Sequence, residues 1–541
     1  MTARAVASRA AETLDGRTDA RTAETFDGRG AETLDGSTDA RTAETRDGRT
    51  DAHAELSVRD AFRQVFPGVM VAMFLAAADQ TILASALPTI ASRLGGFEYV
   101  SWVVVAYLLA ATIAAPLYGH LGDRFGRKRV LLIALTIFTF ASVGCALAPN
   151  LPTLIAARGL QGLGGGGLMT LAQALIGEHV PPRDRGRFQG YFAAVFALAS
   201  TSGPILGAYL TEHLTWRSVF AVNIPLGVLA AYLARRIPSV PPARAGRYEP
   251  DVVGTLLFCF ATLGLLVTLS FAGHGLAFDS WPLYALILAV VAAYASLYFW
   301  ERQSSHPVIP VRLLRRPEIA RPDLVVICFA AALFACVLYL PLYLQLGRGL
   351  GIGTSGTLLL PITLSMVMGA TLTGRLVSRT GKVTIFPVTG LSLATLALVT
   401  LGATITFAPT ALVLVLTAVT GGGLGMVMPA MQVAVQHAAG REALGAAIGS
   451  MSLCRSIGGA MGVAATGALI FVAIGHSDSA ASVVLQEVLH TGPGYLEHLS
   501  AAERATIGEH LGHTFRIVFF SIAGVTAIGA LLATTVPKPK F

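Results

Sequence analysis

The stretch Gly119-His-Leu-Gly-Asp-Arg-Phe-Gly-Arg127 decides how this chain folds, because it returns in the second half of the sequence. The second copy reads Gly374-Arg-Leu-Val-Ser-Arg-Thr-Gly-Lys382, about 255 residues later. The two copies share the pattern Gly-x-Leu-x-(Asp/Ser)-Arg-x-Gly-basic, and each follows a long apolar run. Glycine-rich stretches recur in the same way, at 162–167 and 421–425. The chain is therefore predicted to consist of two related halves.

The composition places both halves in a membrane. Of the 541 residues, 54% are hydrophobic and 13% are charged, against roughly 25% charged residues in ordinary soluble domains. This lack of charge excludes a soluble enzyme, a disordered chain and a nucleic-acid-binding protein. The net charge of +8 would also suit a nucleic-acid-binding protein. The basic residues, however, lie in short loops between apolar runs, so we interpret them as topology signals and predict no nucleic-acid partner.

Apolar runs of about 18 to 25 residues alternate with polar breaks from Phe66 onward, and a helix needs about 20 residues to cross the hydrocarbon core. The predicted spans are 68–90, 101–119, 130–148, 152–176, 188–211, 217–236, 252–272, 283–300, 324–346, 355–377, 384–406, 409–434, 444–474 and 515–536. The sequence thus predicts an all-α integral membrane protein with 14 transmembrane helices. The internal repeat divides them into two six-helix bundles with two inserted helices, and two such halves around a midplane site are a transporter architecture.

Four segments follow from this division. They are a disordered, repeat-containing cytoplasmic tail (1–56), an N-terminal six-helix bundle (57–236), a linker with inserted helices 7 and 8 (237–322) and a C-terminal six-helix bundle (323–541) with an extracellular loop at 475–514. The tail repeats the unit Ala-Glu-Thr-Leu-Asp-Gly but has too few apolar residues to stack as a solenoid. A binding role, a low-complexity extension and a start codon assigned too far upstream all stay open for it.

Lysine and arginine residues set the predicted orientation, because cytoplasmic loops carry an excess of them. The loops on one side of the membrane, such as the one with Arg124, Arg127, Lys128 and Arg129, hold about five times as many basic residues as the loops on the other side. We therefore expect a multi-pass protein with both termini in the cytoplasm.

The sequence resembles the major facilitator superfamily, specifically its 14-helix drug:proton antiporter branch (the EmrB/QacA type), over residues 60–536. The stretches that carry the resemblance are Asp79 to Pro88, Gly119 to Lys128, Arg158-Gly-Leu-Gln-Gly162, Ser202-Gly-Pro-Ile-Leu-Gly-Ala208 and Trp216 to Gly227. Ala208 stands where the antiporter motif usually has glycine, which is a small-for-small change. The resemblance implies a major facilitator fold in the bacterial plasma membrane, exchanging a drug for protons by alternating access, without a cofactor.

Asp79 is the only carboxylate well inside a predicted span, and Arg158 is a second deep charge. At 1.5 Å per residue, Asp79 lies roughly 18 Å from the cytoplasmic end of its span. Arg158 lies roughly 9 Å from the outer end of a span that runs in the opposite direction. The two side chains are thus at similar depths, and charges there should face the bundle interior. Two interpretations stay open: Asp79 carries the coupling proton and Arg158 tunes it, or the two form a static ion pair between helices 1 and 4.

The loop after the second span is, by the resemblance, a conformational latch. A carboxylate at a helix–loop junction can bond a helix N-terminus and pair with arginine, so Asp123 is expected to hold the two halves together on the cytoplasmic side. The alternative is that this loop only fixes the topology. Ser378 takes the aspartate's place in the second copy and should latch more weakly. The predicted latch residues are Gly119, Asp123, Arg124, Gly126, Arg127 and Lys128.

Small residues mark two further helices. Gly203, Pro204 and Gly207 are expected to give a tight, bent fifth helix that seals the path and favours exchange over leak, because proline kinks a helix and glycine permits close packing. Ordinary small-residue packing is the alternative. The run 162–167 is unlike a dinucleotide-binding loop, because no strand precedes it and it lies inside an apolar span, so it is predicted to pack helices.

A cavity for lipophilic drugs needs an apolar and aromatic lining with few polar groups, and aromatic rings can hold organic cations. With one deep carboxylate, a neutral or singly charged amphiphile fits better than a multiply charged cation. Arg455 can face this cavity, meet an anionic substrate group or bond backbone carbonyls. The predicted lining residues are Trp102, Tyr107, Gln161, Tyr191, Phe196, Tyr339, Tyr343, Gln345, Met426, Met451 and Arg455.

These observations predict a proton-coupled exporter of hydrophobic drugs, antibiotics or biocides, working as a monomer in the lipid bilayer. Protons serve as the coupling ion, and neither a metal nor a cofactor is expected. A proton-coupled importer of another small solute is the second possibility, against which the Gly203-Pro204 segment argues. A membrane enzyme or receptor is the third, disfavoured because the sequence has neither a metal-ligand cluster nor a catalytic motif.

Overall fold

The computed structural model describes residues 58–94, 100, 102–181, 184–240, 251–271, 280–304, 314–346, 348, 360–440, 442–475 and 501–537. The repeat-containing tail and residues 476–500 of the predicted loop at 475–514 lie outside the described residues. Every regular element in the described part of the chain is an α-helix, as the apolar spans predict.

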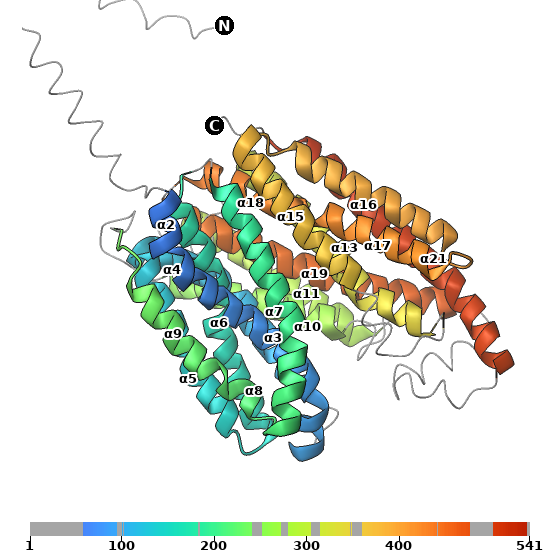
Figure 1. The fold of residues 1–541 in the computed structure, drawn as a ribbon, viewed down its shortest axis with the longest axis horizontal. Coiled ribbons are helices and arrows are strands. Elements are labelled where there is room, and N and C mark those ends of the chain that lie inside the picture. Colours follow the sequence, from blue (N-terminus) through green and yellow to red (C-terminus); the bar gives the residue numbers. More distant parts are fainter. Residues whose placement is uncertain are drawn as a thin grey trace, which may run out of the picture. The chain divides into compact units, whose positions relative to one another are not determined.

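Two groups of helices correspond to the two predicted halves (Figure 1). The first group consists of α2 (Val58–Gln64), α3 (Phe66–Leu94), α4 (Trp102–Phe125), α5 (Arg127–Leu147), α6 (Leu151–His179), α7 (Arg185–His213), α8 (Ser218–Ala221) and α9 (Asn223–Arg235). Between the groups lie α10 (Val252–Phe271) and α11 (Trp281–Gln303). The second group consists of α13 (Pro317–Leu346), α15 (Leu360–Thr380), α16 (Ile385–Thr404), α17 (Thr410–Gly425), α18 (Val427–Ala439), α19 (Leu444–Gly475) and α21 (Ala501–Thr534).

Within the described residues, 12 spans are long and apolar enough to cross a membrane. The short helices α8 and α9 together make one of these spans, and α17 with α18 makes another. Helices α6 and α7 are 29 residues long but are not among the 12. Glycines lower the hydropathy of α6, whereas several side chains of α7 between 197 and 204 lie outside the described residues. The count of 14 helices therefore stays a prediction.

Glycines in α6 let that helix approach two neighbours at once. A Cβ atom on Gly166 would lie 2.1 Å from the Ala111 carbonyl oxygen on α4, and one on Gly164 would lie 2.6 Å from the Phe138 nitrogen on α5. No real side chain tolerates such distances, so only glycine permits this backbone-to-backbone packing. The glycine-rich run is thus a packing surface, as its place in an apolar span predicts.

The second half repeats this arrangement with α17 in the place of α6. A Cβ atom on Gly425 would lie 2.1 Å from the Met366 carbonyl oxygen on α15, and one on Gly423 would lie 2.3 Å from the Gly390 carbonyl oxygen on α16. The fourth helix of each half therefore packs on the second and third helices through the same kind of contact. The internal repeat seen in the sequence is a repeat of packing.

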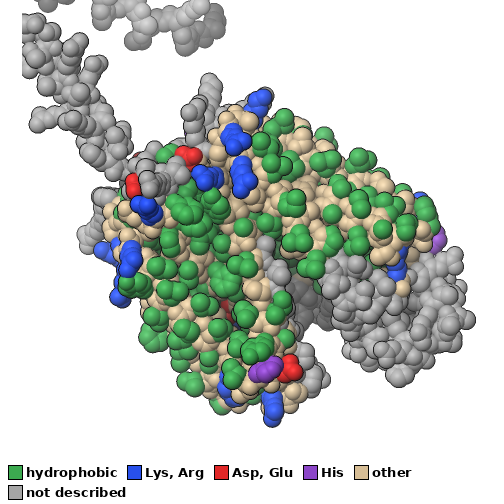
Figure 2. Space-filling model, in the orientation of Figure 1, with side chains coloured by type: hydrophobic (Ala, Val, Ile, Leu, Met, Phe, Trp, Pro, Cys, Tyr) green, Lys and Arg blue, Asp and Glu red, His purple; other side chains and the backbone are tan. Residues whose placement is uncertain are grey.

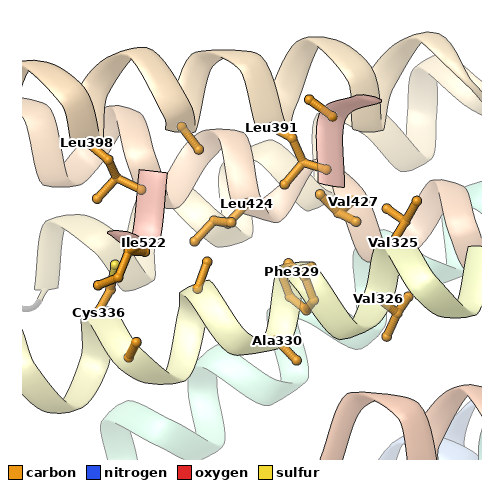
Figure 3. Close-up of a cluster of buried hydrophobic side chains, with 14 of the residues drawn as sticks. Val325, Val326, Phe329, Ala330, Cys336, Leu391, Leu398, Leu424, Val427 and Ile522 are labelled. Atoms are coloured by element: carbon orange, nitrogen blue, oxygen red, sulfur yellow. The ribbon is translucent and has the colours of Figure 1, made fainter. Parts of the chain in front are cut away.

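The core of the second half is built from buried residues of all seven of its described helices. Figure 3 shows Val325 and Phe329 of α13 in one buried cluster with Leu391 of α16, Leu424 of α17, Val427 of α18 and Ile522 of α21, while Val326 and Ala330 point to the other side of α13. On the outside, large apolar side chains stay uncovered, and Phe140 and Phe407 are about three-quarters exposed. Hydrophobic side chains spread over most of the face in Figure 2. Lipid chains are the solvent that suits such a surface.

Two helices extend beyond the predicted spans. Helix α13 begins at Pro317, seven residues before the predicted span 324–346, so the predicted domain boundary at 322/323 falls inside this helix. Arg321 and Asp323 lower the local hydropathy, but proline suits the first turn of a helix. Helix α21 (Ala501–Thr534) likewise begins inside the predicted loop at 475–514 and continues through most of the predicted last span, 515–536.

The inserted helices α10 and α11 pack on both halves. Phe258 of α10 and Leu297 of α11 form a buried apolar cluster with Leu453 of α19, and Ile113 and Leu117 of α4 pack against it. The hairpin therefore touches one helix of each half.

The glycine packing gives a stability prediction. In Gly166→Ala the new methyl group meets the Ala111 carbonyl, so α4 and α6 have to separate, at a cost of about 1–3 kcal/mol. We expect a lower midpoint of thermal unfolding for this variant in detergent. Gly159→Ala is the matched control on the same helix, because a Cβ atom there would meet nothing within 4 Å and alanine favours helix. Equal midpoints for the two variants would contradict the packing role.

Candidate functional site

Asp79 lies in the interior of the first bundle and is 2% exposed. Its Oδ2 accepts a hydrogen bond from Arg158 Nη1 at 2.6 Å. Its Oδ1 accepts from Gln161 Nε2 at 2.9 Å and from Asn223 Nδ2 at 2.6 Å. We call these four residues the Asp79 cage. It joins α3, α6 and α9, and it compensates the carboxylate with one cation and two neutral donors.

Arg158 also makes several contacts besides its bond to Asp79. Its Nε donates to the Val103 carbonyl oxygen at 3.0 Å and its Nη1 also donates to Gln161 Oε1 at 2.7 Å. The guanidinium lies 4.3 Å from the centroid of the Tyr107 ring and 5.8 Å from that of Phe220. Such aromatic faces favour a cation when water is excluded. The position of the arginine is therefore fixed even apart from its bond to Asp79.

The structure thus brings together two charges that lie 79 residues apart in sequence, and both face the bundle interior. A buried ion pair has to recover the cost of leaving water through good geometry and further hydrogen bonds, and the cage supplies both. Removing one partner of such a pair costs about 3–5 kcal/mol, because it leaves the other charge uncompensated. The Asp79–Arg158 pair can therefore hold the bundle together, and a proton on Asp79 would weaken it.

The predicted antiporter helix packs directly beside the cage. A Cβ atom on Gly203 of α7 would lie 2.0 Å from Thr81 Oγ1, and one on Gly207 would lie 2.3 Å from the Ile82 carbonyl oxygen. Thr81 also donates to the Ala199 carbonyl oxygen at 3.0 Å. Helix α7 continues through Pro204, whose side chain lies outside the described residues. The glycines of this motif therefore bring α7 onto α3 within three residues of Asp79.

Asp123 links the two halves. Its Oδ1 accepts from the backbone nitrogen of Gly445 at 2.9 Å, and its Oδ2 accepts from that of Ala446 at 3.0 Å. Both nitrogens belong to the first turn of α19, where helix N–H groups lack intrahelical partners and the helix dipole favours a negative charge. Gly119 makes the approach possible, because a Cβ atom there would lie 2.1 Å from the Gly445 carbonyl oxygen.

Arg127 completes this contact. Its Nη2 bonds Asp123 Oδ1 at 2.6 Å and its Nη1 bonds Glu178 Oε1 at 2.7 Å, so the sequence-based prediction missed Glu178 as a partner. Gly126 precedes α5 with a φ of 91°, a conformation that other residues rarely adopt. Arg124 and Lys128 are half-buried on either side. The predicted latch residues therefore lie together around the capped end of α19.

The second copy of the motif forms the same contact with weaker groups. Ser378 Oγ on α15 accepts from the backbone nitrogen of Arg187 at 3.0 Å, in the first turn of α7. A Cβ atom on Gly374 would lie 2.1 Å from the Gly186 carbonyl oxygen. Each half thus caps a helix of the other half. A neutral hydroxyl bonds one N–H group where the Asp123 carboxylate bonds two, and hydrogen bonds with a charged partner are roughly twice as strong.

The predicted cavity residues fall into separate places. Tyr107 and Gln161 belong to the surroundings of Asp79, and Tyr191 lies edge-on to Phe62, Phe66 and Phe188 near the start of α7. Tyr339 donates to the Val463 carbonyl oxygen, Tyr343 donates to that of Ile405, and Met451 lies in the core of the second half. Trp102, Phe196, Met426 and Arg455 are half-buried, and the Gln345 side chain lies outside the described residues. A shared drug cavity remains a prediction.

Two buried polar residues were missed. Asn223 stands inside an apolar span, which is a signal that sequence reasoning could have used. Asp323 on α13 is 4% exposed, so Asp79 is not the only carboxylate inside a span, contrary to the prediction. The predicted span began at residue 324, one position too late to include it.

Comparison with known proteins identifies the class. The family model described as Major Facilitator Superfamily matches residues 69–463, and the chain belongs to this superfamily of membrane transporters. Its relatives are transporters and not enzymes. The comparisons leave the 14-helix branch a prediction.

Similar proteins include drug transporters. The chain is 32% identical over 475 residues to an uncharacterized MFS-type transporter of Mycobacterium tuberculosis, covering 87% of this chain and 68% of that protein. It is 33% identical over 410 residues to the multidrug transporter protein MdtP of Bacillus subtilis, covering 74% of each chain. The crystal structure of the human organic anion transporter MFSD10 has the same fold, with a TM-score of 0.60 and 15% identity over 87% of this chain and 99% of that one.

The unequal caps predict unequal effects on the contact between the halves. Asp123→Ala removes hydrogen bonds to a charged group, each worth about 1.5–3 kcal/mol, whereas Ser378→Ala removes a neutral one worth about 1 kcal/mol. At 1.4 kcal/mol per tenfold, we expect Asp123→Ala to raise the fraction of molecules with separated halves by about tenfold or more, and Ser378→Ala to raise it less.

Double electron–electron resonance measures that separation. The spin labels are attached to cysteines introduced at the exposed positions Arg129 and Glu442, in a background without the five native cysteines. Both variants are compared with the doubly labelled parent protein. A larger shift for Ser378→Ala than for Asp123→Ala would contradict this assignment.

Proposed function

We propose that this transporter exports hydrophobic or singly charged amphiphilic drugs, antibiotics or biocides across the bacterial cytoplasmic membrane, in exchange for protons and by alternating access. The names of relatives such as MdtP support the drug class. The observation that carries the proposal is the contact between Asp79 and Arg158 inside the first bundle. Ionisable residues at membrane depth are commonly functional, and paired ones mark proton pathways.

A proton on Asp79 would change the cage in a defined way. The neutral carboxyl group no longer compensates the guanidinium, so the charge-assisted bond to Arg158 weakens. Arg158 keeps the Val103 carbonyl oxygen, the Gln161 amide oxygen and the Tyr107 ring. The amides of Gln161 and Asn223 remain beside the carboxyl group. The main loss is therefore the charge-assisted bond between Asp79 of α3 and Arg158 of α6, and deprotonation restores it.

Packing offers a route from this link to the rest of the first bundle. Helix α3 contacts α9 through Asn223 and α7 through the glycines at 203 and 207. Because the contact through Asn223 is buried and the glycine contacts are too close to leave any gap, α3 cannot shift without moving its neighbours. We propose that proton uptake by Asp79 is converted in this way into a rearrangement of the whole bundle.

The capped end of α19 supplies the second element of the cycle. We assign this end to the cytoplasm because arginines surround it. With Asp123 and Ser378 both bonded to the opposite half, we propose that the structure represents a state closed to the cytoplasm. Opening towards the cytoplasm then requires the hydrogen bonds of Asp123 to α19 and of Ser378 to α7 to break. The drug then binds from the cytoplasmic side. Trp102, Met426 and Arg455 are the half-buried candidates for substrate contact.

The test is Asp79→Asn, which keeps the size of the side chain but cannot carry the proton. Purified protein in liposomes, with a pH gradient, is assayed for ethidium efflux. We expect Asp79→Asn to reduce the gradient-driven rate by at least about tenfold, the scale of losing one charge-assisted interaction. Asp251→Asn is the matched control: it makes the same substitution at a carboxylate that bonds Gly254, Trp300 and Ser304 of the inserted helices and takes no part in the cage, so gradient-driven efflux should persist.

Size-exclusion profiles of both variants establish that they fold. Gradient-driven efflux by Asp79→Asn with the pH dependence of the parent protein would sink the proton-carrying role and leave the static ion pair.

A further inference from the structure

Asp323 is a further buried carboxylate inside a candidate membrane span, in the half of the molecule that lacks Asp79. It lies six residues after Pro317, the first residue of α13, hence roughly 9 Å along the helix. Its side chain faces α19 and is 4% exposed. Helices α3 and α13 are the first spans of the two repeated halves, so each half has a buried carboxylate on its first helix, at a different depth.

The surroundings of Asp323 differ from the Asp79 cage. Its Oδ2 accepts one hydrogen bond, from Ser450 Oγ on α19 at 3.0 Å. Its Oδ1 is buried and has no hydrogen-bond partner among the residues that the structure describes. Asp79 has three donors, one of which is a cation, whereas Asp323 has one neutral donor among the described residues. The site therefore leaves one carboxylate oxygen free to carry a hydrogen atom.

No described cation lies within 4.0 Å of the Asp323 carboxylate. Arg321 lies two residues earlier but donates to the Thr535 carbonyl oxygen at the end of α21. Cys454 on α19 is close enough to interact electrostatically with Asp323, and it is neutral as a thiol. The other titratable groups described on α13 near Asp323 and on the packed helices are Glu318, Arg455, His437, His513 and Arg516, and α17 has none.

An ionised carboxylate in such a place would be a buried charge without a counter-charge, which is far more costly than a buried neutral group with one hydrogen bond. A metal ion would need more oxygen ligands than one carboxylate and one hydroxyl, and the described residues include no group of three or more metal-binding side chains. A proton is thus the ligand that these residues can hold.

We propose that Asp323 is a proton-binding residue of the second half, separate from Asp79. Its coupling to drug export rests on the proposed function, but the binding of the proton itself does not.

The position of Ser450 links this site to the latch. Ser450 lies on α19 about one helical turn after Gly445 and Ala446, whose N–H groups are capped by Asp123. An ionised Asp323 accepts from Ser450 more strongly than a neutral one does. The proton on Asp323 therefore sets how firmly α13 holds α19, just beyond the turn that Asp123 holds from the other half.

The experiment is pH-difference infrared spectroscopy of the purified full-length protein in detergent. The buffer is raised from about pH 5 to about pH 10, which spans the range in which perturbed carboxyl groups titrate. We expect the parent protein to lose absorbance in the C=O stretch of a protonated carboxyl group. Asp323→Asn should lack this loss, and Asp79→Asn should retain it. Ser450→Ala should keep the loss but shift its frequency, because the hydrogen bond to the carboxyl group is gone.

An identical loss of absorbance in Asp323→Asn and the parent protein would overturn the proposal. So would a change that follows Na⁺ at constant pH and not the proton. If Asp323→Asn does not fold, Ser450→Ala decides, because an unshifted band would assign the absorbance to another carboxyl group.

Ethidium efflux from liposomes separates this proposal from the proposed function. A parent protein that shows the Asp323 band but no gradient-driven efflux would refute the exporter and keep the proton site. If gradient-driven efflux is present, Asp323→Asn should lose part of its pH dependence.

Discussion

A charge inside the bilayer has to be compensated by the protein itself, because lipid supplies neither water nor counter-ions. This constraint organises the first half around the Asp79 cage, where one carboxylate receives three hydrogen bonds from two other helices. The same constraint explains why Arg158 is bonded to a carbonyl group and faces aromatic rings. The helices that surround the cage are positioned by the need to satisfy it.

Close helix packing is the second requirement, and glycine meets it. Direct hydrogen bonds between side chains on different helices, such as that between Asp79 and Asn223, require the backbones to lie near each other. Gly203 and Gly207 bring α7 onto α3, and the glycines of α6 bring that helix onto α4. In a membrane, where apolar side chains gain little by leaving lipid, such close contacts contribute much of the packing energy. The hydrogen bonds of the Asp79 cage therefore depend on the close helix packing that the glycines permit.

The sequence could predict the helical class, the two related halves and the pairing of Asp79 with Arg158, because apolar length, repeated motifs and depth are readable from residue order. It could not predict the ends of helices such as α13, since Arg321 and Asp323 make a buried turn look like a loop. Nor could it find the partners of Tyr339 and Tyr343, which donate to carbonyl groups of other helices. An aromatic residue looks the same in sequence whether it lines a cavity or completes a core.

The repeat is symmetric in backbone and asymmetric in chemistry. Gly119 and Gly374 approach the opposite half with the same calculated Cβ contact of 2.1 Å, but Asp123 places a full charge at the helix N-terminus where Ser378 places a hydroxyl. The buried carboxylates are unequal too, because Asp79 has a cation and Asp323 does not. If both halves had the same residue at this position, the two helix caps would be equally strong, and neither would break before the other. Differing groups at matching positions give the two halves different strengths, so that proton binding in one half can change a contact made by the other.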